Sequence, residues 1–229
     1  MDGAPGDGLE DDPRPACGPG CACTIGNEFN ERQARRELAT YRRRGPDQTT
    51  SWLIDGLVAR GVTGLTVLDI GAGVGAVHLQ LLKDGAASAT DVDGSPAYVV
   101  AAREESALQG LGDRVSYLVG DFVTLAREIP PADVVVLDRV VCCYPDMAAL
   151  VKQSVARARQ SYGLVYPRDT WWIRAGAGAL NGFARLTRQR VRAYIHRTID
   201  VDGIVRAAGF EPRFRRTTLF WQVAVYARA

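Results

Sequence analysis

The sequence predicts an α/β fold in which a doubly wound, mostly parallel sheet ends in an antiparallel hairpin. The apolar run Val67–Ile70 breaks into the glycine-rich stretch Gly71–Gly75, which is the pattern of a buried strand that turns sharply into a helix. Further strands and helices alternate along the chain, as they do in parallel sheets. Near the end, two successive strands are predicted over 213–218 and 220–228 with no helix between them. This pair predicts the hairpin.

Length and composition predict one domain rather than two. The chain has 229 residues, of which 47% are hydrophobic, and this is enough to bury a substantial core. Its formal net charge of +2 is too small for a protein that binds polyanions non-specifically. Eleven arginines nevertheless lie between Arg168 and Arg216. They indicate either an anionic partner near this third of the chain or a solvated arginine-rich surface.

The cysteines indicate a reducing compartment. There are five of them, Cys17, Cys21, Cys23, Cys142 and Cys143. An odd number, in a chain that shows no signal peptide, argues against a disulfide framework and predicts a cytoplasmic protein. No apolar run approaches the ~20 residues of a transmembrane helix, so we expect no membrane insertion.

Residues 1–28 are predicted to form a flexible, cysteine-containing tail, because they are rich in Gly, Pro and Asp and show no apolar period. The spacing Cys17-x-x-x-Cys21-x-Cys23 would let the thiols share a soft metal or metalloid. No second pair or histidine follows at zinc-finger spacing, however. We therefore predict no metal site, with a ligand or redox role for these cysteines as the alternative.

Residues 29–61 are predicted to form an N-terminal helical lid. Helical periodicity covers 29–44 and, after a Gly-Pro stop, 49–60. Both helices precede the first strand, where a segment that covers the entry to a site would lie. Tyr41, which shares the apolar face of the first helix, is either a cofactor contact or a packed aromatic.

The glycine turn predicts a cofactor that lies on bare backbone. Gly71, Gly73 and Gly75 lack the Cβ that would block a ligand's approach, and they permit positive φ. With Ala76 in the last place, the turn also satisfies the relaxed dinucleotide fingerprint G-x-G-x-x-G/A. The turn alone therefore leaves a nicotinamide cofactor open.

Asp93 adds a ribose contact to this prediction. A helix is predicted over 76–83 and a strand over 87–92, so that Asp93 follows the strand, 22 residues after Gly71. From this place a carboxylate can accept hydrogen bonds from both hydroxyls of a ribose. A Ser-Pro start then predicts the helix over 97–108.

Two later strands end in acidic residues at the same edge. The strand predicted over 115–119 leads into Asp121 and Phe122, which suit the exocyclic amine and the ring face of an adenine. The strand over 133–138 is apolar, as a strand buried on both faces must be, and it ends at Asp138. The remaining predicted elements are a helix over 147–160, a strand over 163–166, an aromatic helix over 171–186, an irregular segment over 188–197 and a helix over 199–208.

These motifs together resemble the class I S-adenosylmethionine-dependent methyltransferases, over nearly all of residues 49–228. The resemblance implies a Rossmann-like, seven-stranded sheet, S-adenosylmethionine as the cofactor, and a methyltransferase domain over 62–229 with a substrate-side insertion at about 171–198. Asp69 and the glycine turn would lie near the amino-acid part of the cofactor. The implied cofactor-binding residues are Tyr41, Asp69, Gly71, Gly73, Gly75, Asp93, Asp121, Phe122 and Asp138.

Within that superfamily, the last third is most similar to the magnesium-protoporphyrin O-methyltransferases. The similarity rests on Tyr144-Pro145, on the run Tyr166–Trp171 and on Arg192–Arg197. Tyr41 also lies where that group has a tyrosine over the cofactor. That group has a histidine immediately before its Tyr-Pro, where this sequence has Cys143. The pair of a tyrosine and a histidine proposed for that group's catalysis is therefore only half present.

The predicted function is methyl transfer to a small anionic or aromatic molecule, at oxygen. A carboxylate acceptor, with a pKa near ~4, arrives ionised and needs no base, whereas a phenol or alcohol requires one. Arginines would hold a carboxylate by bidentate hydrogen bonds. The candidate catalytic residues are Tyr41, Cys143, Tyr144 and His196. The candidate substrate-binding residues are Arg139, Arg168, Trp171, Arg192 and Arg197.

Three alternative functions stay open. Cys142 and Cys143 are either small apolar packing residues or, in the first alternative function, Cys143 holds a soft sulfur or metalloid acceptor, with or without the tail cysteines. The chain would otherwise be an NAD-dependent oxidoreductase, or a non-catalytic, metal-responsive binding protein. Nucleic acid is not an expected partner, because no basic arm or stacking platform accompanies the arginines.

Overall fold

The computed structural model describes residues 30–186 and 194–229. The strands are β1 Thr66–Ile70, β2 Ser88–Asp93, β3 Val115–Val119, β4 Ala132–Asp138, β5 Ala158–Pro167, β6 Phe210–Thr217 and β7 Trp221–Arg228. The helices are α2 Glu31–Arg44, α3 Gln48–Val58, α4 Ala76–Lys83, α5 Pro96–Leu108, α6 Phe122–Leu125, α7 Met147–Val155, α8 Trp171–Leu186 and α9 Thr198–Ala207. Two short 3₁₀ helices are η1 Gly112–Arg114 and η2 Val141–Cys143.

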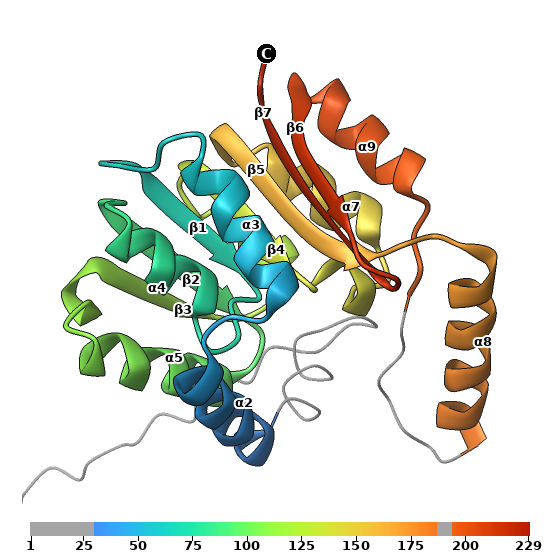
Figure 1. Cartoon of the computed structure of the whole chain (residues 1–229), viewed down its shortest axis with the longest axis horizontal. Coiled ribbons are helices and arrows are strands. Elements are labelled where there is room, and N and C mark those ends of the chain that lie inside the picture. The colour runs from blue at the N-terminus through green and yellow to red at the C-terminus, as the bar shows by residue number, and fades with distance from the viewer. Residues whose placement is uncertain (1–29, 187–193) are drawn as a thin grey trace, which may run out of the picture.

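A single seven-stranded sheet carries the fold, in the order β3-β2-β1-β4-β5-β7-β6 (Figure 1). The first five strands of this order pair in parallel, whereas β7 is antiparallel to both β5 and β6. The predicted doubly wound, mostly parallel sheet with a C-terminal antiparallel hairpin is therefore confirmed.

Helices cover both faces of the sheet, and the central strands bury side chains on each. Along β4, Val134 and Val136 pack into the core beneath α3 and α4, while Val135 and Leu137 pack into the core beneath α7 and α9. All four side chains are buried, because successive side chains of a strand point to opposite faces. In Figure 1, α3 and α4 lie in front of the sheet and α7 lies behind it.

The two N-terminal helices have different surroundings. Leu53 and Leu57 of α3 are fully buried against the sheet, and a Cβ on Gly56 would lie 2.9 Å from the ring of Phe214. Thus α3 is part of the helical layer that covers the sheet. By contrast, α2 buries Ala34 and Leu38 against α5. The lid predicted over residues 29–61 stays a prediction.

The boundary between α7 and β5 differs from the prediction. The helix was expected over 147–160, but α7 ends at Val155 and β5 begins at Ala158. Ala158 and Ser161 pair with β4, and Ser161 also pairs with Ala227 of β7. Pairing with two strands outweighs the helical pattern of this short segment.

Two further differences concern short or peripheral elements. The helix α6 follows β3 immediately, where none was predicted; its N-cap Asp121 accepts a hydrogen bond from the Val123 amide. The edge strand β6 begins at Phe210, three residues before the predicted start, with a register shift at Pro212. An edge strand tolerates a proline at such an irregularity.

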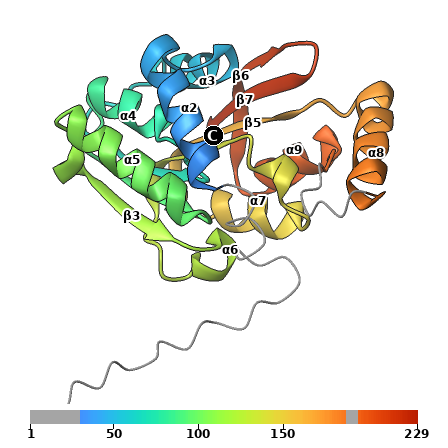
Figure 2. The same ribbon diagram turned by 90° about the horizontal axis from the view of Figure 1, so that it is seen from below.

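The segment after β5 lies at the periphery. In both views α8 stands at the outer edge of the molecule (Figures 1 and 2). In the described parts of the chain, no helix has the length and apolar character needed to cross a membrane.

Candidate functional site

A cavity of about 420 Å³ opens at the carboxyl ends of the parallel strands. Its walls come from the glycine turn after β1, from Asp93 after β2, from Asp121 and Phe122 after β3, and from the segment that follows β4. Ligands of open α/β sheets bind at this edge, and the volume lies within the range of small-molecule sites.

Positive φ favours glycine at all three positions of the turn, and two of the positions also lack room for a Cβ. Gly71, Gly73 and Gly75 have φ of 66°, 59° and 83°, in the region that residues with a Cβ rarely adopt. A Cβ on Gly71 would lie 2.5 Å from the side chain of Val140, and one on Gly75 would lie 2.8 Å from the ring of His78. A Cβ on Gly73 would meet nothing nearer than 3.7 Å. Of the three, Gly71 and Gly73 line the cavity.

Asp69 lies beneath the turn rather than in the cavity. Its side chain is buried, and one carboxylate oxygen accepts a hydrogen bond from the His78 amide at 3.3 Å and lies 2.9 Å from His78 Nδ1. His78 is fully buried. Asp69 is not part of the cavity wall, and its other carboxylate oxygen, Oδ1, has no hydrogen-bond partner among the described residues. The predicted contact between Asp69 and the cofactor stays a prediction.

Asp93 lines the cavity and is held in place by two backbone amides. Its Oδ2 accepts a hydrogen bond from Gly73 at 3.0 Å, and its Oδ1 accepts one from Ser95 at 2.8 Å. Burial raises the pKa of Asp93 to about 6, against the effect of these two hydrogen bonds. The carboxylate is therefore tied to the glycine turn, and it titrates near neutral pH.

Asp91 is a buried acid that sequence analysis did not single out. It lies directly opposite Asp69 in the pairing of β1 with β2. Burial, together with the nearby charges of Asp69 and Asp93, raises its pKa well above the usual range. Neither carboxyl oxygen has a hydrogen-bond partner among the described residues. Two aspartates in register on adjacent buried strands were the signal for this cluster.

Asp121, Phe122 and Tyr144 come together on one wall. The Tyr144 hydroxyl lies 3.1 and 3.0 Å from the two carboxylate oxygens of Asp121 and donates to them. Phe122 is buried against the core, with part of it on the cavity wall. The sequence placed Asp121 and Tyr144 in separate roles, whereas the structure joins them by a hydrogen bond.

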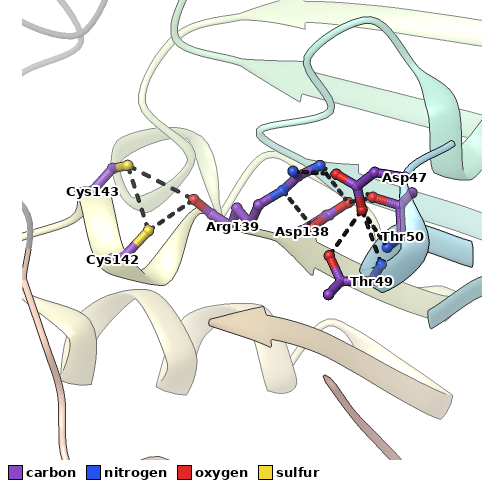
Figure 3. A network of polar contacts seen from close by, with 7 residues as sticks. All are labelled: Asp47, Thr49, Thr50, Asp138, Arg139, Cys142 and Cys143. Atoms are coloured by element: carbon purple, nitrogen blue, oxygen red, sulfur yellow. Dashed lines mark hydrogen bonds and ion pairs between the residues drawn. The ribbon is translucent and has the colours of Figure 1, made fainter. Parts of the chain in front are cut away.

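Arg139 serves as an anchor between two elements (Figure 3). Its guanidinium donates to Asp47, which caps α3, to Asp138 at the end of β4, and to Thr50. Thr50 in turn donates to Asp138. The guanidinium predicted to bind substrate is therefore already engaged with two carboxylates.

The pKa values of Arg139 and Asp138 depend on each other. Burial alone would lower the pKa of Arg139, but the carboxylates of Asp138 and Asp47 outweigh it and raise that pKa. Burial raises the pKa of Asp138 in spite of Arg139 and Thr50. Asp138 lines the cavity, and its side chain is less exposed than those of Arg139 and Asp47.

Cys142 and Cys143 lie in η2, directly after this anchor (Figure 3). Their sulfurs are 3.7 Å apart, and both residues line the cavity. Cys142 is buried and Cys143 is partly exposed. The structure therefore places both sulfurs, not Cys143 alone, at the site.

Two predicted catalytic residues lie outside the walls of this cavity. Tyr41 lines a neighbouring cavity bounded by α2, and burial raises its pKa. His196 contacts the backbone of the segment that follows β4, with its Nε2 3.3 Å from the carbonyl oxygen of Tyr144. Burial lowers the pKa of His196, which favours the neutral imidazole.

The other predicted substrate-binding residues also have different partners. Arg168 donates to the carbonyl oxygen of Thr218 at 3.2 Å, and Arg197 lies 3.9 Å from Asp200. Trp171 is 80% exposed on α8 and is absent from the cavity wall. Arg192 lies outside the described residues, as do the three tail cysteines.

The cavity fits a nucleoside cofactor such as S-adenosylmethionine. Bare backbone at Gly71 and Gly73 forms a cradle that a Cβ would fill, and an acid follows each of the two neighbouring strands. Asp93 can accept from ribose hydroxyls, and Asp121 can accept from an exocyclic amine. No group of three or more His, Cys, Asp or Glu side chains that could hold a metal occurs in the described part of the chain.

Comparison with known proteins identifies the domain. A methyltransferase domain family matches residues 67–161. The ribosomal protein L11 methyltransferase of Escherichia coli (strain K12 / DH10B) is 34% identical over 108 residues, which are 47% of this chain and 36% of the relative. This chain therefore matches about a third of the length of that curated relative.

Solved structures share the fold over most of the chain. A magnesium protoporphyrin IX methyltransferase from Synechocystis PCC 6803 with bound SAH has a TM-score of 0.71 at 21% identity, covering 91% of this chain and 99% of that one. An O-methyltransferase family 2 protein from Planctomyces limnophilus in complex with apigenin has a TM-score of 0.64 at 17% identity, covering 87% and 62%.

The domain match and the fold agree with the site geometry. Residues 67–161 match a methyltransferase domain, and the chain shares its fold with a methyltransferase that was solved with bound SAH.

Proposed function

We propose that this protein transfers the methyl group of S-adenosylmethionine to an oxygen atom of a small anionic or aromatic molecule. One observation carries this proposal: the residues suited to the cofactor and the Cys143-Tyr144 segment after β4 line the same cavity. A bound cofactor and an acceptor would then meet in one cavity, which is what an in-line displacement needs.

The proposed cofactor contacts follow from the cavity wall. Gly71 and Gly73 present backbone, Asp93 accepts from the ribose, and Asp121 accepts from the adenine amine beside Phe122. Asp69 supports the turn from beneath through His78. When bound, S-adenosylmethionine supplies an electrophilic methyl group on a positively charged sulfur, so these residues chiefly bind and orient.

An aromatic acceptor has more support than an anionic one. Arg139, Arg168 and Arg197 each have partners within the chain, so none is an uncommitted anion ligand. Two proteins of similar fold are a magnesium protoporphyrin IX methyltransferase and an O-methyltransferase in complex with apigenin, which supports an acceptor with a ring system. The cytoplasmic setting remains a prediction from cysteine usage.

Tyr144 is the proposed group for handling the acceptor's proton. It lines the cavity, and its hydroxyl is held by Asp121. A phenolic acceptor would lose its proton toward this pair, whereas a carboxylate acceptor would need no base. His196 remains a proposed alternative base, although its Nε2 faces the Tyr144 carbonyl.

The test is methyl transfer from labelled S-adenosylmethionine to a panel of aromatic carboxylic acids and phenols, with product analysis by mass spectrometry. We expect an O-methyl ester or ether from at least one acceptor class, and loss of product in Tyr144→Phe for phenols only. Tight NAD binding without S-adenosylhomocysteine binding would instead favour an oxidoreductase. Methylation of a protein or at sulfur alone would also contradict the proposal.

A further inference from the structure

Cys142 and Cys143 are adjacent thiols that share one hydrogen-bond acceptor. Their sulfurs lie 3.7 Å apart, and both lie within hydrogen-bonding distance of the carbonyl oxygen of Arg139, at 3.2 Å from Cys142 and 3.7 Å from Cys143 (Figure 3). Neighbouring side chains often point apart. Here, η2 turns both sulfurs to the same side.

The backbone that holds this arrangement is unusual. Arg139 has φ of 62° and is the one residue other than glycine with positive φ in the described part of the chain. Its guanidinium is fixed by Asp47 and Asp138, and its amide donates to Val165 of β5 at 2.8 Å. Residues in such disfavoured conformations concentrate at functional sites. The conformation fixes the carbonyl that orients both thiols.

The two thiols are also reachable and chemically unequal. Both line the cavity, so a small molecule can reach them from there. The hydrogen bond from Cys142 lowers the pKa of the Cys143 thiol, and the same bond raises the pKa of Cys142. Cys143 therefore ionises first, and the thiolate is the form that binds soft electrophiles.

The number of donors limits what this pair can hold. Structural zinc takes four ligands, whereas no group of three metal-ligating side chains exists among residues 30–186 and 194–229. The pair suits a soft centre that needs only two sulfur donors.

We propose that Cys142 and Cys143 form a dithiol site that chelates a trivalent organoarsenical. Two As–S bonds form and two As–OH bonds break, and the two thiol protons leave with the hydroxyl groups as two molecules of water. Arsenic stays trivalent and no oxidant is needed. The inference concerns binding alone, so it stands or falls independently of the proposed methyl transfer.

Phenylarsine oxide is the probe for this site, and the full chain with Cys17→Ser, Cys21→Ser and Cys23→Ser is the test protein, because the tail thiols would bind the probe too. Intact mass spectrometry should show one phenylarsenic group per chain. Thiol titration should fall from two free thiols to none. An excess of a dithiol should release the group, whereas the same concentration of a monothiol should not.

Single variants separate chelation from attachment to one sulfur. In the same background, Cys142→Ser and Cys143→Ser should each lose the monothiol-resistant adduct, and circular dichroism checks that each is folded. An adduct that resists a monothiol in either variant would overturn the proposal. Two outcomes on the folded parent protein would also overturn the proposal. These are absence of the adduct and loss of only one thiol per arsenic.

Discussion

Asp93 combines two requirements that oppose each other. Its carboxylate must be ionised to accept hydrogen bonds from a ribose, yet burial raises its pKa to about 6. The amides of Gly73 and Ser95 stabilise the charged form, but they do not cancel the desolvation. Ionisation of Asp93 is therefore incomplete around pH 6, and a ligand that prefers the charged form must compete with a proton.

This competition predicts a pH dependence of cofactor binding. Because the pKa of Asp93 is raised, the protonated form gains population as pH falls through about 6. We expect the affinity for S-adenosylhomocysteine to be constant above pH 7 and to fall by up to about tenfold per unit below pH 6. Calorimetry between pH 5 and 8 measures this. Asp93→Asn should bind weakly at every pH, and a parallel decline in that variant would assign the effect to another group.

Gly73 permits a test of close approach that is separate from backbone strain. Gly73 and Gly64 both have positive φ, and a Cβ on either meets no heavy atom closer than 3.7 Å. An alanine at either place should cost roughly 1 kcal/mol of stability. Of these two glycines, only Gly73 lines the cavity. We therefore expect Gly73→Ala to weaken S-adenosylhomocysteine binding by at least about tenfold, or about 1.4 kcal/mol, while Gly64→Ala binds normally.

Urea unfolding and calorimetry of the two glycine variants complete this test. Equal loss of stability with unequal loss of affinity is the expected pattern. Equal loss of affinity would show that strain, rather than the blocked cradle, governs binding.

At the scale of elements, Arg139 connects the start of α3 to the end of β4. Its contacts with Asp47, Asp138 and Thr50 stabilise an arginine in a backbone conformation that glycine adopts more readily. The ion pair with Asp47 is half exposed, so solvent screens much of it. The less exposed Asp138 carries more of the effect, because without Arg139 its charge loses its nearest counter-charge.

A pair of substitutions separates these contributions. Arg139→Ala loses the guanidinium and keeps the left-handed strain, whereas Arg139→Gly loses the guanidinium but relieves the strain. Strain relief outweighs the added flexibility of the unfolded chain, so the glycine variant should be more stable than the alanine variant by about 1 kcal/mol. Urea denaturation measures the difference. A less stable glycine variant would mean that the strain at Arg139 is negligible.

The elements that the sequence predicted well are those whose signals are local. The strand before Gly71 and the Ser95-Pro96 helix start were readable from side-chain chemistry and turn residues. The early end of α7 was not, because the segment from Ala158 pairs with strands distant in the chain. Pairing of that kind leaves little trace in local propensity.

The candidate site was predictable to a similar extent. Asp93, Asp121 and Asp138 follow strands, and parallel strands end at one edge, so their convergence follows from topology. The engagement of Arg139 with Asp47 joins residues 92 positions apart, which no local pattern indicates. The same limit hid the pairing of Tyr144 with Asp121, since each residue had a sufficient explanation alone.

At the scale of the whole molecule, the cavity depends on segments spread over much of the chain. Its wall includes Glu37 of α2, the turn after β1, the segment after β4 and Trp221 of β7. A ligand that touches all of these binds the folded state and not the unfolded chain. Cofactor binding should therefore stabilise the entire domain and not only the glycine turn.

Thermal unfolding provides the final test of the cofactor. S-adenosylhomocysteine at about 100 times its Kd should add about 2.7 kcal/mol to the free energy of unfolding. For a chain of 229 residues, this corresponds to a rise in Tm of about 5–11 °C. NAD at the same concentration should leave Tm unchanged, and Asp93→Asn should lose most of the shift. A larger shift with NAD would contradict the cofactor assignment, because binding energy that favours the folded state identifies the ligand for which the cavity is built.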